Sequence, residues 1–322
     1  MRLIHAPGFF VGLVLILLGQ LALSLAAQAQ PLRVTLGTAT PGGGFQLFGQ
    51  HLIEVINTHS TTIQLEEQST RGSRQNLTLL EKGTLDLGQV EGNAARVALE
   101  GLGREKANLK VLSVMYPNPG MFVVRADSPY QRIADLEGRP IAFGTRASGL
   151  RILAADVLDG LGLSPEQDFE PIILDRAADG PVLVLEQNAA ALWGAGIGWP
   201  GFVKVADSPV GARFIAPDAE QIARIRQQHP HLAPMSVPAN TYRGQNEAID
   251  SVGLWSLILI RPDLDEETVY QLARALHQSE SALAGQLAQA RYTTTKNTVE
   301  QVPPQRLHTG AARYYREIGL LP

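Results

Sequence analysis

The 322-residue chain contains no cysteine. This absence excludes a disulfide framework, a cysteine nucleophile and a lipid anchor attached through a thiol. A chain of this length can bury a sizeable core without cross-links, and the length suggests about two domains. The fold therefore depends on packing and hydrogen bonding.

The chain also carries little net charge of either sign. Charged residues make up 18% of the sequence, the formal net charge is −4 and the isoelectric point is near 6.0. A balance of this kind creates no positive field for a phosphate backbone. Nucleic acid is therefore excluded as a partner.

Catalytic signatures are missing as well. There is no Gly-x-Ser-x-Gly elbow, no His-Glu-x-x-His motif and no Gly-Lys-Ser/Thr of a P-loop. The seven histidines are scattered, and His229 and His231 flank Pro230 in a predicted exposed turn. We expect no enzyme activity, no cofactor and no metal site.

Long apolar runs are confined to the first 30 residues. Arg2 precedes the apolar runs 9–18 and 21–27, and the small-residue pattern Ala27-Gln28-Ala29 follows. This order predicts a signal peptide, residues 1–29, and hence a periplasmic protein that starts near Gln30. An uncleaved membrane anchor is the alternative, because residues 9–27 approach the roughly 20 needed to span a bilayer.

After this segment, strand-like and helix-like stretches alternate, which favours an α/β fold with mostly parallel sheets. Strands are predicted at residues 32–37, 63–67, 85–90, 109–115, 121–125, 140–143, 172–174, 189–193 and 252–260. Helices are predicted at residues 45–57, 73–82 and 150–161, with a long one opening at Asp265, Glu266 and Glu267.

Proline and glycine suggest where one domain ends. The sequence Pro117-Asn118-Pro119-Gly120 predicts a break between strands and the first crossing between domains. Residues 252–260 are expected to cross back. The predicted organisation is therefore lobe 1 (30–121 plus 252–322) and lobe 2 (122–251), two α/β lobes joined by two strands.

Two glycine-containing junctions between a strand and a helix are the main functional feature. Gly42, Gly43 and Gly44 precede the helix that opens at Phe45, and a second junction follows Gly144. Helix N-termini at such loops present unpaired backbone N–H groups and a positive dipole end. The pair predicts a cleft for a small anion, with the hydroxyls of Thr38 and Thr40 assisting; a tight turn that needs positive φ is the alternative.

Polar and aromatic residues near other strand ends are further candidates, each open to a purely structural interpretation. Arg71, Ser73, Arg74 and Asn76 open one helix, and Thr145, Arg146 and Ser148 open another, where arginine could pair with a carboxylate. Gln89 and Glu91 end a strand, and Glu91 either holds an ammonium group or caps the next helix. Trp193, Gly198 and Trp199 belong to a glycine-rich loop that offers an apolar wall or a core residue.

In order along the chain, these residues resemble the TAXI class of solute-binding proteins of TRAP transporters. The resemblance rests on Thr38-Ala39-Thr40-Pro41-Gly42-Gly43-Gly44-Phe45, Gly49, Gly72-Ser73 with Asn76-Leu77, Asp135-Leu136-Glu137-Gly138, Ser148-Gly149, Gly198 with Pro200, Tyr242-Arg243-Gly244, Leu307-His308, Gly310 and Tyr314-Tyr315. It departs from the family at Gln46, at Gln89-Val90-Glu91, at Arg146 and at Leu307-His308-Thr309-Gly310.

The resemblance implies a type II periplasmic binding protein fold, with a ligand cleft between two lobes joined by hinge strands. It implies ligand contacts from Thr38, Gly43, Gly44, Phe45, Ser73, Asn76, Ser148 and their neighbours. The partner would be a TRAP membrane permease driven by an ion gradient; a subunit that docks on a membrane sensor kinase is the alternative. The arginines favour a dicarboxylate or an acidic amino acid such as glutamate as the solute. We expect a monomer.

Overall fold

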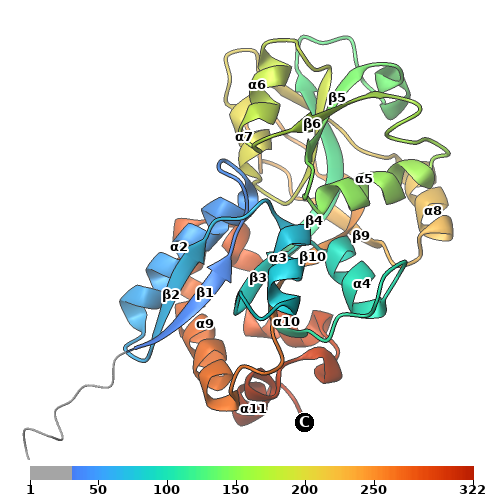
Figure 1. Ribbon diagram of the computed structural model, residues 1–322. Helices are drawn as coiled ribbons and strands as arrows, with labels where there is room; N and C mark the ends of the chain where they lie inside the picture. The colour runs from blue at the N-terminus through green and yellow to red at the C-terminus, as the bar shows by residue number, and fades with distance from the viewer. Residues whose placement is uncertain (1–30) are drawn as a thin grey trace, which may run out of the picture.

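The computed structural model describes residues 31–322 (Figure 1). The predicted signal peptide, residues 1–29, lies outside the described residues. None of the helices described from residue 31 onward is both long enough and apolar enough to span a membrane.

The described strands are β1 (Leu32–Gly37), β2 (Ile63–Gln68), β3 (Leu87–Val90), β4 (Lys110–Arg125), β5 (Pro140–Thr145), β6 (Glu170–Leu174), β7 (Ala191–Ala195), β8 (Ala212–Ile215), β9 (Ala233–Val237) and β10 (Ile249–Ile260). The α-helices are α2 (Gly44–His59), α3 (Ser73–Glu81), α4 (Gly92–Glu100), α5 (Leu150–Asp159), α6 (Asp179–Leu185), α7 (Pro200–Ala206), α8 (Ala219–Gln228), α9 (Glu266–Gln286), α10 (Thr295–Gln301) and α11 (Thr309–Glu317). Short 3₁₀ turns are η1 (Ile133–Leu136), η2 (Ala288–Tyr292) and η3 (Pro304–Arg306).

Local sequence explains where several helices begin and end. The Asp265 carboxylate accepts a hydrogen bond from the Thr268 backbone N–H at the start of α9, and Glu266 and Glu267 occupy its first turn. Acidic groups at this end complement the helix dipole, as the sequence predicts. Gly83, at φ +67°, follows the end of α3, where a left-handed residue terminates the helix.

The sheet has the order β2-β1-β3-β10-β4-β7-β5-β6, with β8 beside β4 and β9 beside β10. Strand β1 is parallel to β2 and β3 at one end, and β5 is parallel to β6 and β7 at the other. Between these parallel groups, β10 and β4 run antiparallel to each other and to their neighbours. The parallel groups follow the predicted α/β pattern, and the two central strands make the sheet mixed.

The predicted break at residues 117–120 is wrong. Strand β4 continues without interruption through Pro117 and Pro119, which pair with Trp255 and Gly253 of β10. Proline is tolerated at bulges and strand edges. A register shift follows Trp255, and β4 gains β7 as its second neighbour only from Gly120 onward.

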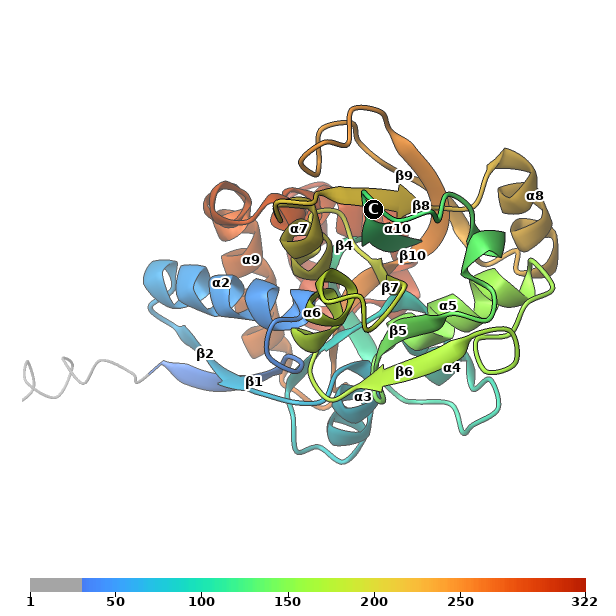
Figure 2. The ribbon, with the colours of Figure 1, turned by 90° about the horizontal axis from the view of Figure 1, so that it is seen from above.

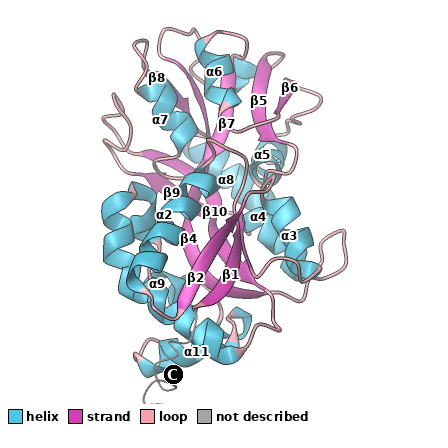
Figure 3. Cartoon of the chain, turned by 60° about the vertical axis from the view of Figure 1, so that its left-hand side comes forward, coloured by secondary structure: helices cyan, strands magenta, loops and turns pink. Residues whose placement is uncertain are grey.

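The apolar core divides into clusters that draw on opposite ends of β4 and β10. Figures 1 and 3 show the helices and strands grouped at those two ends. The largest cluster combines residues between Val34 and Tyr116 with residues between Ile258 and Tyr315, so the C-terminal helices pack with the N-terminal strands. The other two clusters draw on residues between Met121 and Val252. The proposed lobe boundaries near 121 and 251 lie within β4 and β10.

The β4–β10 pair requires glycine at position 253, because a Cβ there would lie 1.8 Å from the Asn118 carbonyl oxygen. We expect Gly253→Ala to lower the free energy of unfolding by about 3 kcal/mol through this clash. Gly285→Ala is the control, since an added Cβ there meets nothing within 4 Å and alanine favours helix by up to about 1 kcal/mol. Urea unfolding measures both; equal midpoints for the two variants would contradict the prediction.

Candidate functional site

A cavity of about 70 Å³ lies where loops from the two halves of the sheet meet. At roughly 10–15 Å³ for each water, this space admits a small solute. Its lining consists of Ala39, Thr40, Gly43, Gly44, Phe45, Arg71, Gly72, Ser73, Glu91, Tyr116, Asn118, Gly144, Thr145, Ser148, Gly149, Leu150, Leu174, Ala177, Trp193, Ala195, Trp199 and Ser256.

The first glycine loop places the start of α2 against the cavity. Gly43 is the N-cap and has no side chain to pair with the first N–H groups of the helix. Those donors therefore remain available to a ligand. Gly44 also allows a close approach, because a Cβ there would lie 2.8 Å from the Trp199 ring. Gly42, at φ +79°, supplies the tight turn. The two predicted roles of the loop, a turn with positive φ and N–H donation to an anion, therefore belong to different glycines.

Helices α3 and α5 begin at the same cavity, on opposite sides of it. Their N-caps, Gly72 and Gly149, likewise provide no side-chain cap. The two sides touch directly, because the Arg74 N–H donates to the Ala147 carbonyl at 3.2 Å. A Cβ on Gly149 would lie 2.6 Å from the Glu91 Cβ and 2.9 Å from the Ser73 Oγ. Three helix starts therefore converge on one small space.

The second contact between the sides involves the first glycine loop itself. The Ala177 N–H donates to Thr40 Oγ1 at 3.2 Å, and the Ala178 N–H donates to the Pro41 carbonyl at 3.3 Å. Figure 2 shows the start of α2 beside α6, which follows these alanines. These bonds close one edge of the cavity, so the structure represents a closed arrangement of the two halves.

Glu91 is the one acidic residue among the described residues of the lining. It caps α4, accepting hydrogen bonds from the backbone N–H groups of Asn93 and Ala94. Burial outweighs these donors and raises the pKa of the Glu91 carboxyl to about 8, with a smaller contribution from the negative charge of Asp156. Near neutral pH this group is predominantly protonated, so it does not repel an anion.

Aromatic rings form the apolar part of the lining. Trp193 donates its indole N–H to the Leu150 carbonyl at 2.9 Å, which ties the ring to the start of α5. Phe45 meets Tyr116 edge to face, with ring centroids 6.5 Å apart. Burial raises the pKa of Tyr116, so this phenol stays neutral and can donate to a ligand. Trp193 and Trp199 are buried and also line the cavity. Each therefore serves both as a core residue and as part of the apolar wall of the cavity.

The structure brings most of the predicted site residues together. Those that line the cavity are Gly43, Gly44, Phe45, Ser73, Glu91, Thr145, Ser148 and Trp193. Those outside the lining are Thr38, Asn76, Gln89, Arg146 and Gly198.

The residues outside the lining have other surroundings. Asn76 Nδ2 donates to the carbonyls of Gly37, Thr38 and Gln89, which joins β1, α3 and β3 beneath the cavity. The Gly198 N–H donates to the Tyr242 hydroxyl at 3.0 Å. Arg71 and Arg146 are both exposed to solvent, but of the two only Arg71 lines the cavity.

Several lining residues were not predicted as site residues from the sequence. Tyr116 and Asn118 lie in β4, Asn118 inside the stretch expected to break and Tyr116 just before it, and Ser256 lies in β10. Asn118 Nδ2 donates to Ser256 Oγ at 2.7 Å, so the two strands share a polar floor. No local motif marks these positions; only the strand pairing brings them to the cavity.

The model of the NMT1-like family matches residues 36–319 of this chain. The chain belongs to the NMT1-like family. This family consists of solute-binding proteins that are not enzymes. The prediction of a solute-binding protein without enzyme activity is therefore confirmed. The finer assignment to the TAXI class goes beyond this match.

Solved structures similar to this NMT1-like protein share its fold. The alkanesulfonate-binding protein SsuA from Xanthomonas axonopodis pv. citri, bound to MOPS, has a TM-score of 0.50 at 19% identity, covering 92% of this chain and 86% of that one. A binding protein component of an ABC phosphonate transporter from Pseudomonas aeruginosa has a TM-score of 0.51 at 11% identity, covering 83% and 81%. The predicted periplasmic binding protein-like α/β fold is confirmed.

The raised pKa of Glu91 predicts a pH dependence of stability. Because the folded pKa of about 8 exceeds the ordinary 4.5, folding favours the protonated carboxyl. This contribution is complete below the unfolded pKa and is lost as pH rises through the folded one. Relative to Glu91→Gln, we expect the free energy of unfolding of the wild type to fall by about 1 kcal/mol per pH unit between these values. Urea unfolding at pH 5, 6, 7 and 8 measures it, with the exposed Glu170→Gln as control; parallel curves for wild type and Glu91→Gln would contradict the assignment.

The close approach of Gly149 to Glu91 and Ser73 predicts a separate effect on closure. We expect Gly149→Ala to weaken solute binding roughly tenfold or more, because the added Cβ is overpacked in the closed arrangement alone. Calorimetry measures affinity, and solution scattering measures whether saturating solute still lowers the radius of gyration. Gly285→Ala should behave as wild type. Wild-type affinity and compaction in Gly149→Ala would show that these contacts do not govern closure.

Proposed function

We propose that this protein is a periplasmic receptor that closes on a small organic anion and delivers it to a membrane transporter. The observation that carries the proposal is the convergence of three helix starts with glycine N-caps, α2, α3 and α5, on one cavity. Two of their N–H groups are already paired, Arg74 with the Ala147 carbonyl and Leu150 with Ser148 Oγ, whereas those at the start of α2 have no side-chain cap. Together their backbone N–H groups and dipoles favour negative charge. The fourth helix start, that of α4, is already paired with the Glu91 carboxyl.

The remaining polar groups support an anionic solute. Arg71 is the one cationic side chain in the described lining, and Glu91 is neutral near pH 7. Tyr116, Trp199 and Ser148 add hydroxyl and indole groups that can donate to oxygen. The lining therefore contains many donors and little negative charge, which suits a carboxylate or another oxyanion.

The apolar part of the lining limits the size and polarity of the non-acidic part of the solute. Phe45, Leu150, Trp193 and Trp199 face the cavity beside the donors, and the space is about 70 Å³. A short carbon chain bearing an acidic group fits this division better than a sugar or a peptide. We propose a short dicarboxylate or an acidic amino acid such as glutamate, with one acidic group at the helix starts and Arg71 near the other.

The transport partner follows from the sequence motifs. The ordered TAXI-like motifs favour a TRAP permease, whereas the two structural neighbours include a component of an ABC transporter. We propose the TRAP permease because the motifs lie in this chain itself, while likeness at 11% identity extends to the fold alone. Residues 1–29 would direct export to the periplasm.

A thermal-shift screen against dicarboxylates, amino acids, keto acids and neutral sugars tests the solute class. A bound solute raises the melting temperature by mass action, and we expect the rise with an acidic class alone. Arg71→Gln should then weaken that solute by about 1.5 kcal/mol, roughly tenfold in Kd, because a charged hydrogen bond is lost.

Arg146→Gln is the matched control, since it removes the same charge from an exposed position outside the lining. Its affinity should equal that of the wild type within about twofold. A shift with neutral solutes only, or equal losses in the two arginine variants, would contradict the proposed role of the cavity donors.

A further inference from the structure

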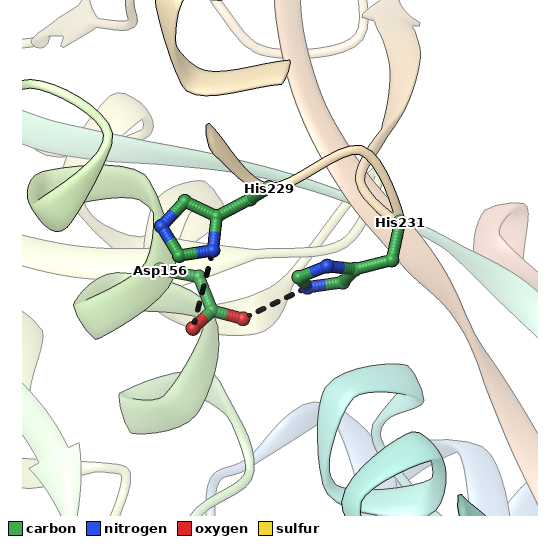
Figure 4. A group of neighbouring side chains, drawn as sticks. All are labelled: Asp156, His229 and His231. Carbon is green, nitrogen blue, oxygen red and sulfur yellow. Dashed lines mark hydrogen bonds and ion pairs between the residues drawn. The ribbon is translucent and has the colours of Figure 1, made fainter. Parts of the chain in front are cut away.

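Three side chains form a cluster between α5 and the connection that follows α8. Asp156 belongs to α5, and His229 and His231 follow α8 on either side of Pro230 (Figure 4). Both imidazole rings face the Asp156 carboxylate, one toward each oxygen. His231 Nε2 lies 3.1 Å from Oδ2, and His229 Nδ1 lies 3.9 Å from Oδ1. None of the three lines the cavity.

We propose that Asp156, His229 and His231 bind a divalent transition-metal ion of the Zn²⁺ type. One ligand atom from each residue lies within 4.8 Å of the others. In a tetrahedral zinc site with bonds of about 2.0–2.1 Å, ligand atoms are separated by roughly 3.3 Å. His231 Nε2 and His229 Nδ1 approach different oxygens of Asp156, at 3.1 and 3.9 Å, so rotation of these side chains would be needed to bring one atom of each to ligating distance.

The donor set also fits zinc. Two imidazole nitrogens and one carboxylate oxygen are a recurring three-residue set, with water in the fourth position. The side chains of Asp156, His229 and His231 retain 23%, 17% and 15% exposure. The three side chains are therefore mostly buried but still reach solvent. This partial exposure gives the ion an entry path and leaves room for water as the fourth ligand.

A further carboxylate prepares His229 for metal binding. His229 Nε2 lies 2.8 Å from Asp159 Oδ2, one turn after Asp156 in α5. A carboxylate accepts the proton of this nitrogen, so the other nitrogen, Nδ1, keeps its lone pair toward Asp156. Metal-binding histidines commonly have such a carboxylate partner, and here Gln228 Nε2 donates to the same Asp159 oxygen and steadies it.

The ion would link two segments distant in sequence. Asp156 and Asp159 belong to α5, whereas the histidines lie in the connection between α8 and β9. Pro230 restricts the backbone between the two rings, and the Leu232 N–H donates to the His229 carbonyl at 3.0 Å to close the turn. The site would therefore stabilise this half of the protein without touching the solute.

Metal binding is tested on the full-length gene product, purified without a polyhistidine tag and treated with chelator. Calorimetry with Zn²⁺ should show one site, and Zn²⁺ should raise the melting temperature. We expect His229→Gln and His231→Gln to weaken Zn²⁺ at least 100-fold, and Asp159→Asn to weaken it roughly tenfold through loss of the carboxylate partner. Co²⁺ in place of zinc should give the visible absorption of a four-coordinate site.

His51→Gln is the matched control, because it removes an imidazole from α2 and should leave Zn²⁺ affinity unchanged. Circular dichroism and solute binding confirm that each variant is folded, since the ligands do not line the cavity. No Zn²⁺ binding by the wild type, or equal affinity in His229→Gln, His231→Gln and wild type, would overturn the proposal. In that case the cluster is a network of ion pairs and hydrogen bonds, and the proposed solute receptor stands independently.

Discussion

The antiparallel pairing of β4 with β10 is the constraint on which the rest of this structure depends. These two long strands carry the chain across the sheet in opposite directions, and each parallel group is built outward from them. Their tight approach at Gly253 leaves no room for a side chain beside the Asn118 carbonyl. Because the strands also present Tyr116, Asn118 and Ser256 to the cavity, the connection between the halves is at the same time the floor of the site.

Closure across this floor rests on few direct bonds. The Ala177, Ala178 and Arg74 N–H groups each donate to the facing loop, at 3.2 to 3.3 Å. Breaking such bonds exchanges them for bonds to water at modest net cost. In the proposed receptor, a solute that contacts both sides would shift the balance between open and closed arrangements. Gly149 allows the close approach of the two sides, since a Cβ there would lie 2.6 Å from the Glu91 Cβ.

Electrostatics inside the cavity combine dipoles with a carboxyl that is held neutral. Backbone donors at the starts of α2, α3 and α5 favour negative charge, and Arg71 is the one cationic side chain in the described lining. An ionised Glu91 would oppose negative charge in the cavity, but burial raises its pKa to about 8. The neutral state of Glu91 therefore depends on its burial beside the cavity.

Local chemistry in the sequence predicts much of this arrangement, because glycine loops, helix caps and alternating apolar residues act over a few neighbours. The helix starts at Ser73 and Leu150, the start of α2 within one residue of the expected Phe45, and the family's binding function follow from such patterns. Tertiary structure alone decides which polar residues face the solute. Arg71 and Arg146 look equivalent in sequence, as do Ser73 and Asn76, yet only the first of each pair lines the cavity. The continuity of β4 through its prolines, and the meeting of Asp156 with His229 and His231, depend on partners far away in the chain, which no local pattern encodes.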